Sequence, residues 1–276
     1  MTMPTTGPTT GRAASSSARA ASSSARAASP SARAGAPSPA AQASSGPSTA
    51  RAGSQARDAA ADDLQIAGLV SLSTVDWPGH LVATVFLQGC PWRCTYCHNS
   101  AILDPRTPGV VPWQAVRDLL ARRRGLLDGV VFSGGEPTRQ AGLVAAMREV
   151  KEAGFLVGLH TGGAYPRRLR QLLPLVDWVG LDIKAPARLY RTITRTGGPT
   201  TSADQAFSSL ELVLASGVDV QVRTTVDPTV MSDDDVAELT AVLAERGVRE
   251  HVLQTVRADG TTEEYRAALA AVRDAR

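Results

Sequence analysis

The feature that most constrains the fold is the alternation of short apolar runs with longer amphipathic stretches that begins after Leu64. The apolar runs predict strands at 81–88, 129–133, 155–160, 178–184, 219–226 and 250–256. The amphipathic stretches predict helices near 112–124, 140–153, 165–173, 203–216 and 232–246. Gly154, Gly217 and Gly247 stand where three of these helices should end.

Six strands separated by helices form repeated βα units, which require a parallel sheet with right-handed crossovers. Two architectures satisfy this pattern: an open doubly wound sheet, or a full or partial barrel. Both bind ligands at the carboxyl ends of their strands. We therefore expect the chemistry of this chain in the residues that follow each predicted strand.

The N-terminal segment has a different composition, being almost entirely Ala, Ser, Gly, Pro, Thr and Arg up to about residue 60. The heptapeptide Arg-Ala-Ala-Ser-Ser-Ser-Ala occurs there twice in tandem. Such a segment cannot bury enough apolar surface to fold, so we expect a disordered tail at 1–62 and a folded domain at 63–276. An organelle transit peptide and a later start of translation are alternative interpretations of the tail.

The charge of the chain is also divided at this boundary. Six of the 29 Lys and Arg residues precede Asp58, the first acidic residue, which leaves 23 basic against 26 acidic residues in the rest. The sequence pI near 9.0 therefore reflects the tail and does not indicate a nucleic-acid-binding domain. The sequence contains no apolar run of about 20 residues, so we expect no membrane interaction.

Cysteine usage points to a reducing compartment. Three cysteines confined to eight positions cannot form a disulfide framework, and an odd number cannot pair completely within one molecule. The N-terminus also lacks the apolar core of a secretion signal. We therefore expect a cytoplasmic protein.

The cysteines Cys90, Cys94 and Cys97 follow the first predicted strand with the spacing Cys-x3-Cys-x2-Cys. Three thiolates can hold a cubane iron–sulfur cluster and leave one iron open to another ligand. Structural zinc normally has four protein ligands, so a zinc site would need His98 or a distant residue as well. Incidental buried cysteines are the remaining interpretation of this loop.

Polar residues also follow the later predicted strands. The second strand ends in Gly134-Gly135-Glu136-Pro137, and two adjacent glycines would let backbone approach a ligand closely. Charged residues inside apolar parallel strands are costly unless they are paired or bind a ligand. We expect the tips of Asp182 and Lys184 to converge on a ligand and not to form an ion pair with each other. His160 and Thr161 end the third strand and Arg223 lies in the fifth.

With these residues in place, the chain resembles the radical S-adenosylmethionine (SAM) superfamily. The cysteine spacing after a strand and the Gly-Gly-Glu-Pro segment one βα unit later match the superfamily's signature. The resemblance implies an α/β fold, a partial (β/α)6 TIM-like barrel with parallel strands preceded by a disordered N-terminal tail. It also implies two cofactors, a [4Fe-4S] cluster on Cys90, Cys94 and Cys97, and S-adenosyl-L-methionine.

The resemblance further implies which residues contact the SAM cofactor. Tyr96 would lie against its adenine, His98 would flank it, and the segment that contains Glu136 would bind its amino group. Lys184 and Arg223 would hold its carboxylate or ribose, and Asp182 would organise that region. The full set of implied contacts is Tyr96, His98, Gly134, Gly135, Glu136, Pro137, Thr161, Asp182, Lys184 and Arg223. Packing for Tyr96, a satisfied loop residue for His98 and an ordinary salt bridge for Arg223 are the alternatives.

Within the superfamily the chain is similar to the anaerobic ribonucleoside-triphosphate reductase activating proteins and the related pyruvate formate-lyase activating enzymes. The similarity rests on Ser73–Gly79, on the cysteine loop and on the segments around Gly158, Asp182 and Arg223. It departs from the family at His160, where the activating enzymes often have Asp. Asp76 and Trp77 are candidates for touching a partner protein, or for a turn with a hydrophobic plug.

This resemblance implies an oxidoreductase that reductively cleaves SAM and generates a glycyl radical on a partner enzyme, the anaerobic ribonucleotide reductase. A low-potential donor such as flavodoxin or ferredoxin would supply the electron. The alternatives are a radical SAM enzyme that acts on a small molecule, and a non-catalytic metal-binding protein. Apart from the cluster and the cofactor, we expect no catalytic residue.

Overall fold

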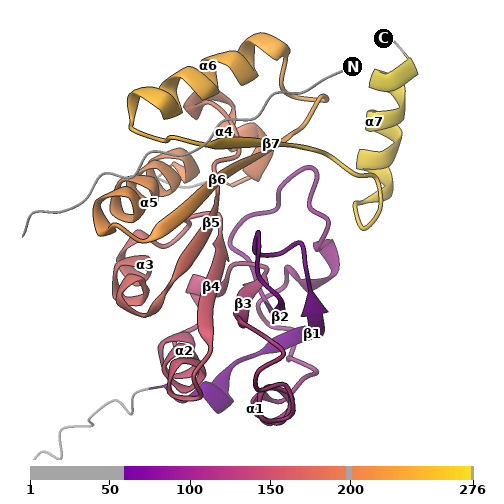
Figure 1. Ribbon diagram of the computed structural model, residues 1–276. Helices are drawn as coiled ribbons and strands as arrows, with labels where there is room; N and C mark the ends of the chain where they lie inside the picture. The colour runs from indigo at the N-terminus through magenta and orange to yellow at the C-terminus, as the bar shows by residue number, and fades with distance from the viewer. Residues whose placement is uncertain (1–58, 197–200, 275–276) are drawn as a thin grey trace, which may run out of the picture. The chain divides into compact units, whose positions relative to one another are not determined.

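Seven strands form one sheet in the computed structural model, which describes residues 59–196 and 201–274 (Figure 1). Six of them lie where the sequence predicted strands, within two residues at each end. The strands are β1 (Ile66–Ser73), β2 (Val82–Leu87), β3 (Gly129–Gly134), β4 (Leu156–Thr161), β5 (Trp178–Asp182), β6 (Asp219–Val226) and β7 (His251–Thr255).

The strands follow one another in the sheet in the order in which they occur in the chain. Strands β2 to β7 are all parallel, whereas β1 pairs antiparallel with β2. Sequence analysis missed β1, an edge strand whose residues between Ile66 and Ser73 are all intermediate or exposed. The short connection between β1 and β2 allows only an antiparallel pair.

The sequential order decides between the two predicted architectures. A doubly wound sheet reverses its strand order at a switch point, whereas right-handed crossovers in one direction place every helix on the same side of the sheet. Figure 1 shows α2, α3 and α5 in a row along one side. Among the described residues the outer strands β1 and β7 each have a single neighbour, so the sheet is an open, partial barrel as predicted.

The helices include the five predicted ones and two that were not predicted, α4 and α7. Their bounds are α1 (Trp113–Arg122), α2 (Leu143–Glu152), α3 (Pro166–Leu172), α4 (Ala187–Thr194), α5 (Ser202–Ser216), α6 (Asp233–Glu245) and α7 (Glu263–Asp274). Short 3-10 helices are η1 (Ala61–Asp63), η2 (Ser100–Ile102), η3 (Pro137–Arg139) and η4 (Leu173–Leu175). No helix in the described ranges is both long and apolar enough to cross a membrane.

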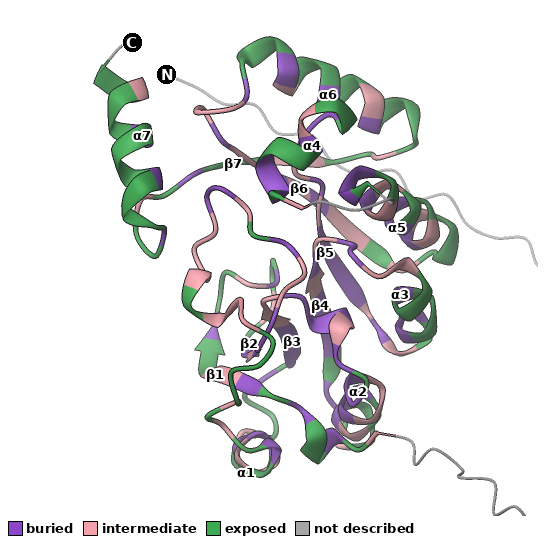
Figure 2. Cartoon of the chain, turned by 180° about the vertical axis from the view of Figure 1, so that it is seen from behind, coloured by how far each residue is buried: buried purple, intermediate pink, exposed green. Residues whose placement is uncertain are grey.

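Figure 2 shows that buried residues lie mainly on the strands and on the helix faces that cover them. The two faces of the sheet bury different clusters of side chains. One face packs under the helices, where Phe132 stacks on Trp113 with 6.1 Å between ring centroids. On the other face Trp77, from the loop before β2, stacks on Trp178 at 5.4 Å. Trp77 is 5% exposed, which favours the plug over the partner contact that was the other interpretation.

The predicted tail falls mostly outside the described residues, since the description starts at residue 59. The last tail residues are nevertheless part of the fold. Ala61 is buried, and Asp62 accepts hydrogen bonds of 2.8 Å from the guanidinium of Arg117 on α1.

Candidate functional site

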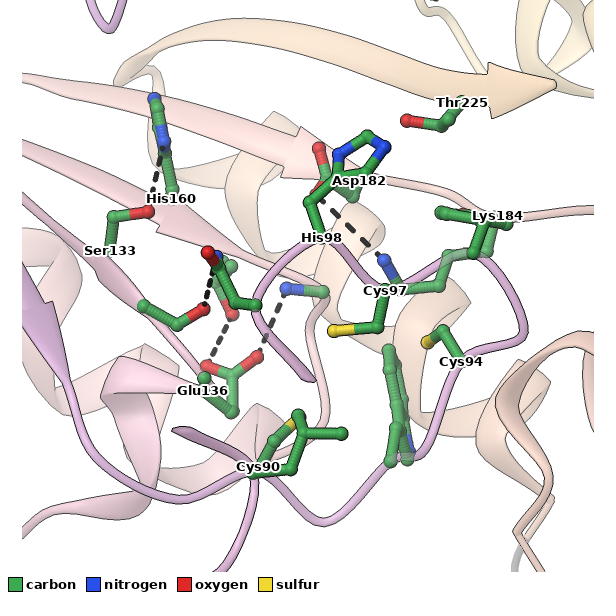
Figure 3. Close-up of a pocket in the computed structure, with 18 of the residues that line it drawn as sticks. Cys90, Cys94, Cys97, His98, Ser133, Glu136, His160, Asp182, Lys184 and Thr225 are labelled. Carbon is green, nitrogen blue, oxygen red and sulfur yellow. Dashed lines mark hydrogen bonds and ion pairs between the residues drawn. The ribbon is translucent and has the colours of Figure 1, made fainter. Parts of the chain in front are cut away.

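The carboxyl ends of the parallel strands and the loop after β2 enclose one pocket (Figure 3). Every residue predicted to hold the cluster or contact SAM lines this pocket, except Pro137, which is buried in η3 directly after Glu136. The structure therefore brings together residues that the sequence scatters from position 90 to position 223. The predicted residues in the lining are Cys90, Cys94, Tyr96, Cys97, His98, Gly134, Gly135, Glu136, Thr161, Asp182, Lys184 and Arg223.

Backbone hydrogen bonds hold the cysteine loop at its start and at its middle. The amide of Cys90 donates to the carbonyl of Leu103 at 3.0 Å, and the amide of Thr95 donates to the carbonyl of Ile193 at the end of α4 at 2.9 Å. This loop has no regular helix or strand between Cys90 and Asn99. Its conformation therefore depends on contacts with distant parts of the chain.

The three cysteines are free thiols that face the pocket. Burial raises the pKa of Cys94 to about 11 and also raises the pKa values of Cys90 and Cys97. Thiols in this environment stay protonated unless a cation binds them, and a coordinated iron would deprotonate them. Three soft donors around one pocket fit a cubane cluster, in which each of three irons takes one thiolate.

Within 59–196 and 201–274, no three His, Cys, Asp or Glu side chains converge closely enough to hold one metal ion. The ligands of a cubane do not need to converge in this way, because each thiolate binds a different iron.

Glu136 is 2% exposed and accepts four hydrogen bonds. Its Oε1 accepts from the amide and hydroxyl of Thr138 at 3.1 and 2.6 Å and from the hydroxyl of Thr161 at 2.7 Å. Its Oε2 accepts from the amide of Gly162 at 3.0 Å and keeps room for one more donor. Burial outweighs these hydrogen bonds and raises the pKa of Glu136.

The glycine pair before Glu136 packs the end of β3 directly against the end of β2 and the start of the cysteine loop. A Cβ on Gly135 would lie 2.4 Å from the carbonyl oxygen of Gly89, and a Cβ on Gly134 would lie 2.3 Å from the amide of Leu87. The amide of Glu136 also donates to the carbonyl of Gly89 at 2.9 Å. The close approach that these glycines permit is therefore to the end of β2, for Gly134, and to the start of the cysteine loop, for Gly135.

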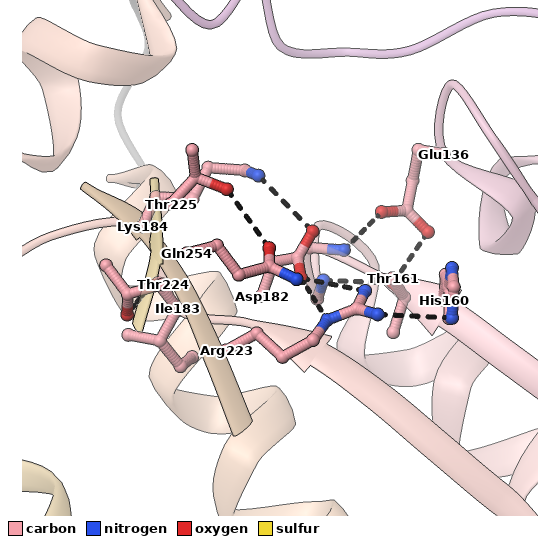
Figure 4. Close-up of polar contacts among 12 residues, drawn as sticks. Glu136, His160, Thr161, Asp182, Ile183, Lys184, Arg223, Thr224, Thr225 and Gln254 are labelled. Carbon is pink, nitrogen blue, oxygen red and sulfur yellow. Dashed lines mark hydrogen bonds and ion pairs between the residues drawn. The ribbon is translucent and has the colours of Figure 1, made fainter. Parts of the chain in front are cut away.

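Two cations share one carboxylate on the opposite wall of the pocket (Figure 4). Arg223 Nε donates to Asp182 Oδ1 at 2.9 Å, and Lys184 Nζ lies 3.8 Å from Asp182 Oδ2. The expectation that Asp182 and Lys184 form no ion pair is wrong, because both side chains turn into the same pocket, although the contact is long. Burial alone would raise the pKa of Asp182, but the charges of Arg223 and Lys184 outweigh it and lower the pKa.

Lys184 also lies over two aromatic rings. Its Nζ is 5.9 Å from the ring centroid of Trp92 and 5.8 Å from that of Tyr96, within the range of cation–π attraction. Trp92 was not predicted as a site residue. It fills the space beside Gly162, where an added Cβ would come within 2.5 Å of the indole.

His160, the position that departs from the activating enzymes, bonds within the protein. Its Nε2 lies 2.7 Å from the carbonyl oxygen of Asp76, and its Nδ1 lies 3.3 Å from Ser133 Oγ. Burial, and then the charge of Arg223, lower the pKa of His160 to about 4, so the ring is neutral at neutral pH. A neutral ring that donates from Nε2 to Asp76 and accepts at Nδ1 from Ser133 satisfies these two contacts, but its Nε2 cannot then accept from Arg223 Nη1, which lies 3.2 Å away.

His98 lines the pocket, but the hydrogen-bond partner of its ring is a backbone group that does not line the pocket. Its Nε2 lies 3.1 Å from the carbonyl oxygen of Arg257, in the segment between β7 and α7. This contact supports the alternative of a satisfied loop residue. Sequence reasoning also missed Ser133, Thr225 and Gln254, which line the pocket from the next-to-last positions of β3, β6 and β7. Their signal was a polar residue near the carboxyl end of a predicted strand.

Comparison with known proteins agrees with this geometry. The family model described as "Radical SAM superfamily" matches residues 84–243, more than half of the chain. The chain is 32% identical over 179 residues to a protein of Methanocaldococcus jannaschii named "Putative glycyl-radical enzyme activating enzyme", covering 63% of this chain and 73% of that protein. It is 30% identical over 186 residues to the pyruvate formate-lyase-activating enzyme of Clostridium pasteurianum, covering 65% of this chain and 76% of that enzyme.

Solved structures share the fold at lower identity. The crystal structure of Streptococcus suis SuiB superposes with a TM-score of 0.51 at 14% sequence identity, covering 68% of this chain but only 44% of that one. This likeness concerns the arrangement of the strands and helices alone. The family model matches more than half of the chain, and the two relatives are covered to 73% and 76% of their length. The chain therefore belongs to the radical SAM superfamily, as a relative of its glycyl-radical enzyme activating enzymes.

Proposed function

We propose that this enzyme generates a glycyl radical on a partner protein, and that the partner is an anaerobic ribonucleoside-triphosphate reductase. The observation that carries the radical chemistry is the gathering of three free cysteines, one buried carboxylate and two cations around a single pocket. The choice of the reductase as partner rests on the sequence resemblance at Ser73–Gly79 and the cysteine loop. The names of the relatives in Methanocaldococcus jannaschii and Clostridium pasteurianum support the activating role.

Membership of the superfamily implies a [4Fe-4S] cluster and SAM, and the pocket has donors for both. Cys90, Cys94 and Cys97 would each hold one iron. When bound, the reduced cluster supplies the electron that cleaves SAM. The remaining tasks, which are binding, orientation and exclusion of water, belong to the residues of this chain.

The charges of the pocket match the methionine end of SAM. Glu136 offers Oε2 to an ammonium group. Lys184 and Arg223 carry two positive charges against the single carboxylate of Asp182, which leaves one positive charge for the carboxylate of the ligand. Trp92 and Tyr96 are 2% and 6% exposed and shield this wall from water, which strengthens each of these interactions.

The proposed setting follows from the chemistry of the site. A cluster held by three thiolates requires a reducing compartment, so we place the enzyme in the cytoplasm. A low-potential carrier such as flavodoxin or ferredoxin would deliver the electron. Residues 63–276 would form the catalytic domain, with 1–62 as its tail.

The proposal is tested by anaerobic reconstitution with iron and sulfide, reduction, and addition of SAM together with the reductase of the same organism. We expect 5′-deoxyadenosine and a glycyl radical detected by electron paramagnetic resonance on the reductase. A parallel sample contains pyruvate formate-lyase, because several relatives are named for that partner.

Three outcomes would contradict the proposal in different ways. A radical on pyruvate formate-lyase alone would overturn the choice of partner. Formation of 5′-deoxyadenosine without a radical on either protein would favour a small-molecule substrate. A chain that takes up neither iron nor sulfide would favour the non-catalytic metal-binding alternative.

A further inference from the structure

The segment between β7 and α7 lies against the cysteine loop, although about 160 residues separate the two in the chain. His98 Nε2 lies 3.1 Å from the carbonyl oxygen of Arg257, and the hydroxyl of Ser100 donates to the carbonyl of Gly260 at 3.0 Å. Gly260 has a φ of +78°, and a Cβ there would come within 2.4 Å of the carbonyl oxygen of His98. Figure 1 shows α7 beside the loop that follows β2.

A buried carboxylate also links the cysteine loop to α7. Asp227, directly after β6, is 0% exposed. Its Oδ2 accepts a hydrogen bond of 2.5 Å from the hydroxyl of Thr95, which lies between Cys94 and Cys97. Its Oδ1 accepts one of 2.8 Å from the hydroxyl of Tyr265 on α7.

The remaining contacts of Asp227 fix its own orientation. Oδ1 also accepts from the amide and the hydroxyl of Thr229 at 3.0 and 2.7 Å. Across the described ranges no Lys, Arg or His forms an ion pair with this carboxylate. A buried carboxylate without a cation is costly unless it is fully hydrogen-bonded, so the hydroxyls of Thr95 and Tyr265 each contribute to keeping it in place.

We propose that Asp227 is a positioning residue that ties the cysteine loop to α7 through Thr95 and Tyr265, and so holds Cys94 and Cys97 at the spacing that the cluster needs. This inference rests on the proposed function only in assuming that the three cysteines bind a cluster. The loop between these cysteines has no regular structure of its own. Its order must come from tertiary contacts, because fixing each residue of an irregular loop has an entropic cost.

The first test needs no cluster. Hydrogen exchange of the full chain, purified without reconstitution, is measured for peptides covering 93–100 in the variants Thr95→Val and Tyr265→Phe. Each substitution deletes one hydroxyl that donates to a buried carboxylate, so we expect roughly tenfold faster exchange in this loop. Val150→Ala, in the buried face of α2, is the matched control, which should lower the melting temperature without selectively affecting this loop.

The second test measures the cluster directly. After reconstitution, loss of iron to a chelator is followed by absorbance, at a temperature where all variants are folded. We expect roughly tenfold faster loss in Thr95→Val and Tyr265→Phe, and wild-type loss in Val150→Ala. Asp227→Asn, which keeps an acceptor for Tyr265, should lose iron more slowly than Asp227→Ala.

The proposal is overturned if Thr95→Val and Tyr265→Phe exchange and lose iron at wild-type rates. It is also overturned if Val150→Ala changes both rates as much as they do, since the effect would then reflect general stability. Failure of the proposed function would give a different result. The wild-type cluster would then assemble, and the variants would show the expected changes in exchange and iron loss, but no radical would form on a partner.

Discussion

Arg223 Nε donates a hydrogen bond of 2.9 Å to Asp182 Oδ1, across the parallel pair β5 and β6 in which the two residues are register partners. The contact orients the guanidinium towards the pocket, and Lys184 approaches the other carboxylate oxygen at 3.8 Å. Asp182 is therefore placed to arrange both cations before a ligand binds.

Asp182→Asn should weaken SAM binding by roughly tenfold, because the guanidinium and ammonium groups lose the charge that orients them. Equilibrium binding of SAM to the reconstituted protein, under anaerobic conditions, measures the change. Arg223→Lys is the companion variant: it keeps the positive charge but loses the hydrogen bond geometry of the guanidinium, and should also bind SAM more weakly. Wild-type affinity in both variants would mean that this wall of the pocket does not contact SAM.

Gly135→Ala should prevent stable cluster assembly while leaving the sheet intact. The added methyl would lie 2.4 Å from the carbonyl oxygen of Gly89 and must push the cysteine loop away from β3. Iron and sulfide content after reconstitution, together with far-ultraviolet circular dichroism, separates these effects. Gly68→Ala is the control, since its Cβ would meet no atom closer than 4.0 Å. Equal cluster content in both variants would contradict the prediction.

His160 should make stability depend on pH. Its pKa is lowered to about 4, so between this value and the ordinary value near 6.5 the unfolded chain binds a proton that the folded chain does not. The free energy of unfolding is therefore highest, as far as His160 is concerned, above about pH 6.5. It falls by up to roughly 3 kcal/mol as the pH is lowered towards about 4.

Urea unfolding at about pH 7.5 and about pH 5 tests this expectation. His160→Gln should reduce the difference in unfolding free energy between the two pH values. Burial also lowers the pKa of His251, so part of the difference should persist in His160→Gln. An unchanged difference in that variant would place the titrating group elsewhere.

Substitution of Cys90, Cys94 or Cys97 by Ala should abolish SAM cleavage, because the described structure places these three free thiols around the pocket. Iron content, visible absorption and 5′-deoxyadenosine formation report the loss. Cleavage that persists when all three cysteines are replaced would refute the cluster assignment.

Local pattern was sufficient for most of the fold. The strands β2, β3 and β5 are almost entirely buried and read as short apolar runs, so they were visible in the sequence. The same reasoning failed for β1, an edge strand, and for the helices α4 and α7. Burial alone does not explain these misses, because β7 was predicted although none of its residues is buried, and α4 was missed although Tyr190 and Ile193 are 0% exposed.

By itself, the sequence determined the cysteine spacing, the repeated βα units and the polar residues at the strand ends, because each depends on neighbours in the chain. Only the tertiary structure decided what these residues touch. The close approach at Gly135, the shared carboxylate of Asp182 and the tie from Thr95 through Asp227 to Tyr265 all join segments far apart in sequence. Such contacts have no local signal, since a hydrogen bond between residues 132 positions apart exists only once the chain has folded.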